Sequence, residues 1–422
     1  MYTDVLAHNP VVRQPRLWST AVQAHLVDLG LLLAFMLGAA LYAGSAHAAL
    51  DPRFSISPIG NDVWFEGDIA PVSDTILHRW TDHSRNVNHP LFPLLSTLPA
   101  YALRAVGLDQ VQRLLALVVI VAAAWGAAVF VLLRLITPTR ADAVLFALLA
   151  YVSAAAIFWL PMTETWALGS TTLLLPLCLL AWDVRRPVRN AWYVVGSVLS
   201  LSVTTPNWVS GIAAAVSARR LRDAIQITAN ALAVTVVLWA VQKALVPPVP
   251  FFIGSGGSRF IGLAAPAAAL RALLVHSVVM PRPELALEPK WGLFLSAQHS
   301  AIGSSGSIGL VATVAWLALL AAGVYALAAA NVSVRVRAAI AMTIAGQFLV
   351  YLAYGEETFL YALHVAPLLI ACAAMATATR IGPWVRGLAG GLVILLLLNN
   401  VPLFAEATAF FARVDRLAPF GR

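Results

Sequence analysis

The sequence predicts an all-α, polytopic membrane protein, a bundle of about 11 spans with further helices along the outer membrane surface. Of its 422 residues, 60% are hydrophobic and only 11% are charged, and the mean hydropathy is +0.83. A chain this apolar needs lipid as its solvent, because water would leave much of its apolar surface uncovered. We therefore expect a single integral membrane domain over residues 1–422 and no separate soluble domain.

Long apolar stretches place the helices along the chain. We expect membrane helices at residues 26–48, 113–135, 142–160, 167–182, 190–205, 222–246, 305–329, 338–354, 359–379 and 384–404. Of two shorter apolar pieces, 207–217 is expected to cross the membrane and 91–107 not to cross it fully. The first stretch also fits a cleaved signal peptide ending at Ala48, but its length favours an uncleaved signal anchor.

Short basic clusters between the apolar stretches predict the orientation. They are Arg134 with Arg140, Arg185 with Arg186 and Arg189, Arg219 with Arg220 and Arg222, Arg335 with Arg337, and Arg380 with Arg386. Cytoplasmic loops are enriched in Lys and Arg, and a cytoplasmic N-terminus places all these clusters inside. We expect this topology in a bacterial plasma (inner) membrane, so the net charge of +8 does not indicate nucleic-acid binding. A full crossing by residues 91–107 would break the topology before Arg185.

Under this topology the acidic residues fall on the outer face. That face receives the first outer loop, residues 49–90, the long outer loop, residues 247–304, and several short turns. The first outer loop carries six carboxylates against three arginines, and the turns carry Glu164, Glu356 and Glu357. In the long outer loop, Arg259 and Arg282 run against the usual preference for basic residues inside. The outer face is therefore where we expect the chemistry.

Residues 59–99 are the most informative stretch, because acids, histidines, arginines and prolines are interleaved there with apolar residues. The apolar positions are Val63, Trp64, Phe65, Ile69, Val72, Ile76, Leu77 and Trp80. This interleaving predicts helices lying on the membrane surface with one apolar face. Such helices hold carboxylates at the bilayer boundary, where a lipid-linked substrate presents its head group. The alternative is a hydrated connector whose carboxylates have no further role.

The order of motifs after the first helix carries a family resemblance. The acids Asp62, Glu66 and Asp68 are followed by His89, Pro90, Leu91, Phe92 and Pro93, by Arg113 opening the next helix, and by outer turns at 163–165 and 202–207. In this order, residues 1–225 resemble the GT-C superfamily of lipid-sugar glycosyltransferases, particularly its protein O-mannosyltransferase and aminoarabinose transferase branch. The sequence departs from the family by lacking an adjacent acidic pair. It also has Pro206 and Asn207 where the family has a lysine.

The resemblance implies a GT-C-like membrane glycosyltransferase that moves a sugar from a polyprenyl-phosphate donor to an envelope glycan, lipid or protein acceptor outside. Such transfer needs a carboxylate base for the attacking hydroxyl and stabilisation of the departing phosphate. Asp68 is the favoured base, Asp62 comes next, and Glu66 is expected to assist by hydrogen bonding or by binding a metal. The expected substrate-binding residues are Arg79, Arg85, His89, Glu164, Arg259, Arg282, Glu356, Glu357 and His364.

No cofactor is certain from the sequence. Acids and histidines are numerous enough outside for a divalent metal, but no helical ligand pair is present, so metal dependence stays open. The expected partners are the lipid bilayer, the lipid-linked donor and the acceptor, without nucleic acid. A transporter or flippase of a lipid-linked glycan is the main alternative, and a non-enzymatic assembly subunit is another. The absence of clear repeats and of mid-membrane charges in the sequence favours the enzyme.

Overall fold

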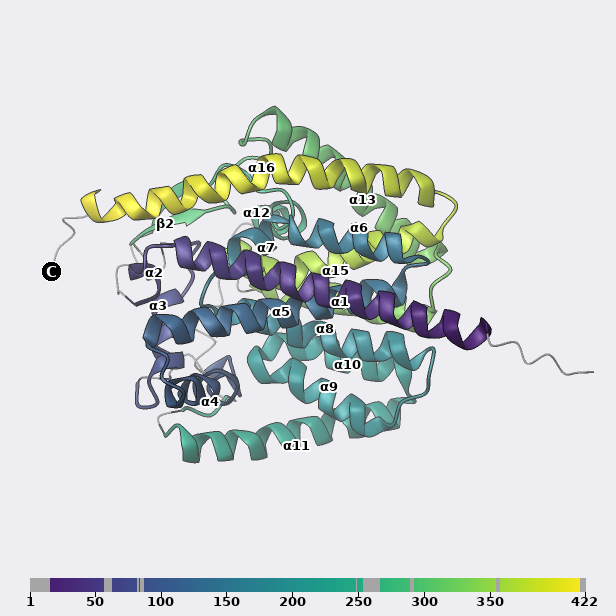
Figure 1. Cartoon of the computed structure of the whole chain (residues 1–422), viewed down its shortest axis with the longest axis horizontal. Coiled ribbons are helices and arrows are strands. Elements are labelled where there is room, and N and C mark those ends of the chain that lie inside the picture. The colour runs from purple at the N-terminus through teal and green to yellow at the C-terminus, as the bar shows by residue number, and fades with distance from the viewer. Residues whose placement is uncertain are drawn as a thin grey trace, which may run out of the picture.

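The computed structural model describes residues 16–56, 63–81, 83, 87–247, 249–252, 266–288, 292–353 and 357–417. Within these ranges most residues are helical, and the strands form one short hairpin. Figure 1 shows the long helices running along the long axis of the molecule. In that view α16 (Gly382–Leu417) lies near one edge and α11 (Leu221–Leu245) along the opposite edge. The described chain is thus a helical bundle, as the sequence predicts.

Eight helices in the described ranges are long and apolar enough to cross a membrane. Besides α11 and α16 they are α1 (Arg16–Ala49), α5 (Gln110–Ile136), α8 (Thr165–Asp183), α13 (Ser307–Ala329), α14 (Val334–Ala353) and α15 (Ala362–Met375), the last extended by the 3-10 turns η6 (Thr358–Tyr361) and η7 (Ala376–Ala378). Each coincides with one of the predicted membrane helices. The all-α membrane class is therefore supported, while the total of about 11 spans stays a prediction.

The remaining helices are shorter. They are α2 (Arg53–Ile56), α3 (Ile69–Leu77), α4 (Phe92–Ala105), α6 (Arg140–Tyr151), α7 (Ala154–Trp159), α9 (Asn190–Val203), the 3-10 turn η3 (Thr205–Asn207), α10 (Trp208–Ala218), α12 (Pro266–Arg271) and the π-helical turn η5 (Ala272–His276). At 14 residues, α4 is about 21 Å long, against roughly 30 Å for a hydrocarbon core. Because α9, which is expected to cross, has the same length, the expectation that residues 91–107 do not cross fully stays a prediction.

The centre of the bundle is built from α5, α8 and α15. Every residue of α15 is buried, as expected for a helix whose apolar residues surround it on all sides. Along α8, small and apolar residues are likewise buried on every face. Against this centre packs α1, where Phe35 stacks on Phe130 of α5 with 5.0 Å between the ring centroids. The long helices α1, α13 and α14 pack around these central helices.

The prediction of one continuous helix over residues 142–160 is wrong, because the chain breaks between α6 and α7. The hydroxyl of Ser153 caps α7 by accepting from the backbone N–H of Ala156. The side-chain amide of Asn400 donates to the carbonyl oxygens of Val152 and Val278, at 2.8 and 2.9 Å. Backbone groups freed inside a membrane need such protein partners. The break is therefore closed by a side chain of α16, which apolar periodicity does not reveal.

Two further features differ from the predicted elements. The last helix was expected to end at residue 404 but continues to Leu417, since Phe411 lies against Phe54 of α2, with ring centroids 3.5 Å apart. An unpredicted antiparallel hairpin joins β1 (Glu284–Glu288) to β2 (Gly292–Ser296). The backbone N–H of Leu295 in β2 donates to the carbonyl oxygen of Val63 at 2.9 Å. Both features cover the first outer loop.

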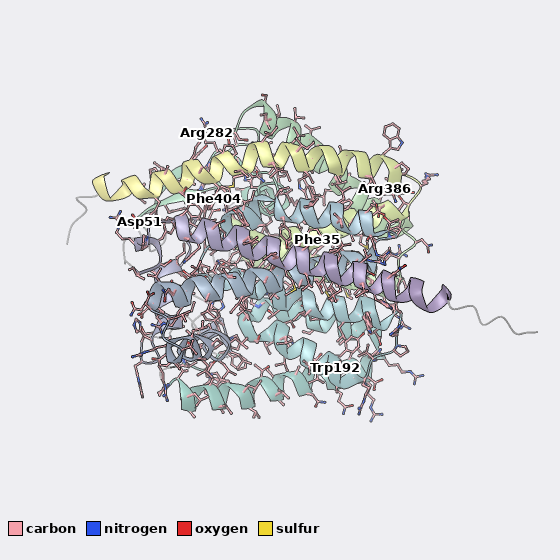
Figure 2. All side chains as sticks on the ribbon, viewed as in Figure 1. Phe35, Asp51, Trp192, Arg282, Arg386 and Phe404 are labelled. Carbon is pink, nitrogen blue, oxygen red and sulfur yellow. The ribbon has the colours of Figure 1, made fainter. Side chains whose placement is uncertain are left out.

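Charged residues divide between the two ends of the bundle. One end holds the ion pairs Arg140 with Asp28 at 2.7 Å, Arg219 with Asp183 at 2.8 Å and Arg386 with Asp142 at 2.6 Å. The other end holds the first outer loop, and Figure 2 shows Arg386 and Asp51 at opposite ends of the molecule. We call the end with Arg386 the basic end and the end with the first outer loop the loop end.

Replacing Asn400 with leucine is expected to destabilise the bundle. The Asn400 side chain donates to the carbonyl oxygens of Val152 and Val278 and accepts from the backbone N–H of Met280. Each buried backbone group left without a partner costs about 1–3 kcal/mol. We expect Asn400→Leu to lower the free energy of unfolding by about 3 kcal/mol or more, measured by thermal unfolding in detergent. The control is Asn230→Leu on the exposed face of α11. Equal melting temperatures for both variants would contradict this role of Asn400.

Candidate functional site

A strained turn leads into Asp68. Phe65 and Glu66 have φ angles of 52° and 57°, in the left-handed region that residues other than glycine seldom occupy. Such strain persists only where the surroundings enforce it, and it gathers at functional sites. Here the ring of Phe65 is fully buried and packs edge-to-face on Phe359, 4.9 Å between the centroids. The buried ring holds the turn in place, and the turn fixes the direction in which the chain enters Asp68.

Asp68 and Glu164 are the acids that the structure brings together. The backbone N–H of Asp68 donates to Oε1 of Glu164 at 2.6 Å, and Glu164 Oε2 accepts from the N–H of Thr165 at 2.7 Å. Glu164 is buried at 8% exposure, whereas Asp68 is half-buried. Both occupy the residue before a helix, α3 and α8 respectively. The positive ends of two helix dipoles therefore meet here and favour negative charge.

Hydroxyl groups fix the surroundings of this acidic pair. Ser73 of α3 and Thr163 share a hydrogen bond at 2.7 Å between their hydroxyl oxygens. Thr163 in turn donates to Ser55 Oγ of α2 at 3.4 Å. His47, near the end of α1, bonds through Nδ1 to the carbonyl oxygen of Pro161 at 2.8 Å. These hydrogen bonds link the turn before α8 to α1, α2 and α3. The backbone around Asp68 and Glu164 is therefore held in place.

An apolar groove has Glu164 in its wall. Its cavity volume is about 40 Å³, between α3, α4, α5 and the start of α8. Its apolar lining includes Ile76, Phe92, Leu95, Leu114, Leu117 and Leu168. Thr163 and Glu164 provide polar groups at its wall, together with Ser96. A groove of this size and composition suits a short apolar segment, with polar groups beside Glu164.

The predicted residues His89 and His364 lie on two sides of one tryptophan. His89 Nδ1 bonds to the carbonyl oxygen of Val203 at 2.6 Å, which fixes its ring. The ring of Trp166, two residues after Glu164, lies 6.2 Å from that of His89 and 5.4 Å from that of His364. Tyr361 meets the same indole edge-on at 5.1 Å. An aromatic cluster thus adjoins the acidic pair.

The sequence did not identify the polar residues around His364. Tyr351 bonds through its hydroxyl to His364 Nδ1 at 2.6 Å, and Asn207 lies 3.4 Å from Nε2. Gln347 donates to Asn207 Oδ1 at 3.1 Å. Two buried atoms here, Trp166 Nε1 and Gln347 Oε1, have no hydrogen-bond partner within the part of the chain that the structure describes. Only Asn207 was signalled, by its place in a predicted outer turn, because the others lie within apolar stretches.

Glu357 belongs to a different part of the loop end. Its buried carboxylate accepts from Ser296 Oγ at 2.5 Å and from the backbone N–H groups of Gln298 and Phe359, both at 3.2 Å. These bonds attach the segment after β2 to the start of η6. Burial raises the pKa of Glu357 to about 7, although the bonds from Ser296, Phe359 and Gln298 counteract the rise. Glu357 therefore fixes a segment that covers the strained turn.

The predicted arginines are not gathered around Asp68 in the described residues. Arg79 lies over the ring of Trp80 at 5.3 Å, and its backbone N–H donates to Tyr101 of α4. The Nε of Arg79 is buried and has no hydrogen-bond partner among the described residues. Arg282 is largely exposed and lies 3.9 Å from Glu406 on α16. Of the two, Arg79 is closer in sequence and structure to the helices that line the groove.

Other predicted residues fall partly outside the description. Glu66 is half-buried in the strained turn, two residues before Asp68. The residues outside the described ranges are Asp62, Arg85, Arg259 and Glu356. Among the residues that are described, no three His, Cys, Asp or Glu side chains gather closely enough to hold a metal ion. Asp68 and Glu164 are thus the acids on which the geometry can be built.

Comparison with known proteins does not assign the sequence to a family. No protein-family model matches the sequence, and no curated protein matches it. The arrangement of Asp68, Glu164, the apolar groove and the aromatic cluster therefore carries the functional proposal.

The raised pKa of Glu357 predicts a specific dependence of stability on pH. A carboxyl with a folded pKa of about 7 and an ordinary unfolded value favours the folded state fully below about pH 4.5. That contribution is lost as the pH rises through 7, by about 3 kcal/mol at most. Glu357→Gln cannot ionise, so we expect the melting temperature of the wild type to fall relative to the variant between pH 5 and pH 8.

The exposed acid Glu406 provides the control for this measurement. Thermal unfolding of Glu406→Gln in the same detergent should follow the wild type across this pH range. A constant difference between the wild type and Glu357→Gln from pH 5 to pH 8 would show that Glu357 does not titrate there.

Proposed function

We propose that this protein is a GT-C-like membrane glycosyltransferase that moves a sugar from a polyprenyl-phosphate donor to an envelope glycan, lipid or protein acceptor. The observation that carries the proposal is the position of Asp68, whose backbone N–H bonds to Glu164 in the wall of an apolar groove. A short segment of the prenyl chain in this groove would place the phosphate and the sugar near these acids. The strained turn at Phe65 and Glu66 adds support, because enforced strain marks functional sites.

In the proposed reaction, the hydroxyl oxygen of the acceptor attacks the anomeric carbon of the sugar. The carboxylate of Asp68 takes the hydroxyl proton as the new carbon–oxygen bond forms. The bond between the anomeric carbon and the phosphate oxygen breaks, and polyprenyl phosphate leaves with the electron pair. One displacement of this kind inverts the configuration at the anomeric carbon. The reaction balances without any further reactant.

Glu164 acts in this proposal as a positioning residue. Its carboxylate accepts from the N–H of Asp68 and from the N–H of Thr165, so it aligns the start of α3 with the start of α8. The dipoles of both helices stabilise negative charge at the same place, including charge that develops on the departing phosphate. The imidazole of His89 and Arg79, which follows the other end of α3, are the candidates to bind the phosphate.

The sugar ring in this proposal contacts the aromatic cluster at its half-buried members, His89 and Tyr361. Aromatic faces and amide groups are complementary to the apolar and polar faces of a sugar, and buried sites with orphan polar atoms reject analogues that lack the matching hydroxyl. Trp166 Nε1 can donate to a sugar hydroxyl and Gln347 Oε1 can accept from one. His364, Asn207 and Tyr351 already bond to one another and hold these groups in place.

The orientation is part of the same proposal. The clusters at the basic end fit the cytoplasmic side of a bacterial plasma (inner) membrane, and the loop end fits the outer side. About 11 spans would result if α9, α10 and the pair of α6 and α7 cross together with the eight long helices.

Replacing Asp68 is the decisive test of the proposed base. We expect Asp68→Asn to lower sugar transfer by about a thousandfold, because proton removal alone contributes about 10²–10⁴ in rate. The measurement is transfer of labelled sugar from synthetic polyprenyl-phosphate donors to membrane-derived acceptors by purified protein. The matched control is Asp74→Asn, on the same helix, where the carboxylate bonds to His78 on the surface. Asp74→Asn should retain the wild-type rate.

Each outcome has a distinct meaning for the function. Equal transfer by the wild type and both variants would refute Asp68 as the base. Movement of a lipid-linked glycan across vesicle membranes without any new glycosidic bond would replace the enzyme by the transporter or flippase. Both variants should first be shown to melt at the wild-type temperature.

A further inference from the structure

A second cavity lies at the basic end, remote from Asp68. It forms where the turn after α5, the end of α8, the turn between α13 and α14, and η7 meet, and its volume is about 550 Å³. The groove at the loop end begins near the start of α5, and this cavity lies at its other end. With 27 residues, α5 separates the two sites by about 40 Å.

The walls of this cavity are amphiphilic. The apolar part includes Leu135, Val184 and Val336. The polar part consists of Thr137, Arg185, Asn331 and Ser333. Such a wall, at the boundary where the apolar helices end, is complementary to a molecule with a polar head and apolar chains.

Positive charge around the cavity exceeds negative charge. Arg134 and Arg140 share one carboxylate, that of Asp28, at 3.0 and 2.7 Å. Arg185 donates to the carbonyl oxygen of Leu135 at 2.7 Å and has no carboxylate among its hydrogen-bond partners in the described chain. Partial desolvation, and after it repulsion by Arg134, lowers the pKa of Arg185, while attraction by Asp28 acts in the opposite direction. An anion beside Arg185 would relieve this repulsion.

A further arginine adds to the same surplus. Arg337 is half-buried and donates to the carbonyl oxygens of Leu327 and Val332, at 2.5 and 3.1 Å. Val332 itself lines the cavity. Carbonyl groups satisfy the N–H donors of a guanidinium but leave its charge uncompensated. Four arginines thus stand near this cavity with Asp28 as the carboxylate that the described residues supply to them.

We propose that this cavity binds the phosphate group of an anionic membrane phospholipid, with Arg185 as its principal contact. The phosphodiester meets the guanidinium, the hydroxyl and amide groups of Ser333 and Asn331 surround the head group, and the apolar wall receives the first part of the acyl chains. Basic pockets between membrane helices on the cytoplasmic side bind lipids of this class. The site is independent of the proposed transferase reaction.

The test measures binding of phosphatidylglycerol to the full chain in detergent, by native mass spectrometry over a range of lipid concentrations. We expect Arg185→Gln to weaken binding of the most tightly held lipid about five- to tenfold, because one charge-assisted contact to phosphate is lost. Arg185→Lys, which keeps the charge, should retain most of the affinity. The control is Arg189→Gln, which makes the same change in net charge in the same loop but lies outside the cavity wall.

Four results would overturn the proposal. The first is equal affinity of wild type and Arg185→Gln for phosphatidylglycerol. The second is equal binding of zwitterionic phosphatidylcholine, which would remove the role of net charge. The third is displacement of the lipid by millimolar inorganic phosphate, which would identify a site for free anions. The fourth is a loss of affinity in Arg189→Gln as large as that in Arg185→Gln, which would show that the lipid is attracted by basic loops in general and not by this cavity.

Discussion

Every backbone polar group that leaves a helix inside the membrane must find a partner in the protein, and this constraint shapes the whole bundle. Side chains from distant helices supply those partners. Asn400 closes the break between α6 and α7, and Gln242 of α11 bonds to both Pro90 O and the N–H of Leu94 at the start of α4. Glu164 does the same where α3 and α8 begin. Irregular backbone is therefore tolerated only where such a side chain reaches it.

The same constraint explains why the acids lie where they do. A buried carboxylate is costly unless hydrogen bonds surround it, and Glu164 receives them from two helix starts. Its position in turn fixes the backbone of Asp68, because the Asp68 N–H bonds to the carboxylate in the groove wall. The strained turn at Phe65 is held by aromatic packing, to which α16 and β2 contribute by covering the first outer loop. The contacts that stabilise the bundle at the loop end are thus the same contacts that position the candidate site.

The long apolar helices and the division of charge could be predicted from the sequence, since lipid requires both. The break at Val152 could not, because its closure depends on Asn400, 248 positions away along the chain. The groove lining was invisible for the same reason. Local spacing identified Asp68, Glu164 and His364, but the tryptophan between the two histidines, Trp166, looked like any other apolar residue. The features that the sequence did not reveal all depend on contacts between residues far apart along the chain, and the periodicity of apolar residues does not encode such contacts.

The most direct test of the account is a cryo-electron microscopy structure of the protein in lipid nanodiscs with a non-transferable polyprenyl-phosphate sugar. The account predicts prenyl density in the groove lined by Phe92, Leu114 and Leu168, with the sugar beside the carboxylate of Asp68. Density for the donor elsewhere would contradict this proposal. A bound sugar whose anomeric carbon lies far from the carboxylate of Asp68 would contradict it as well.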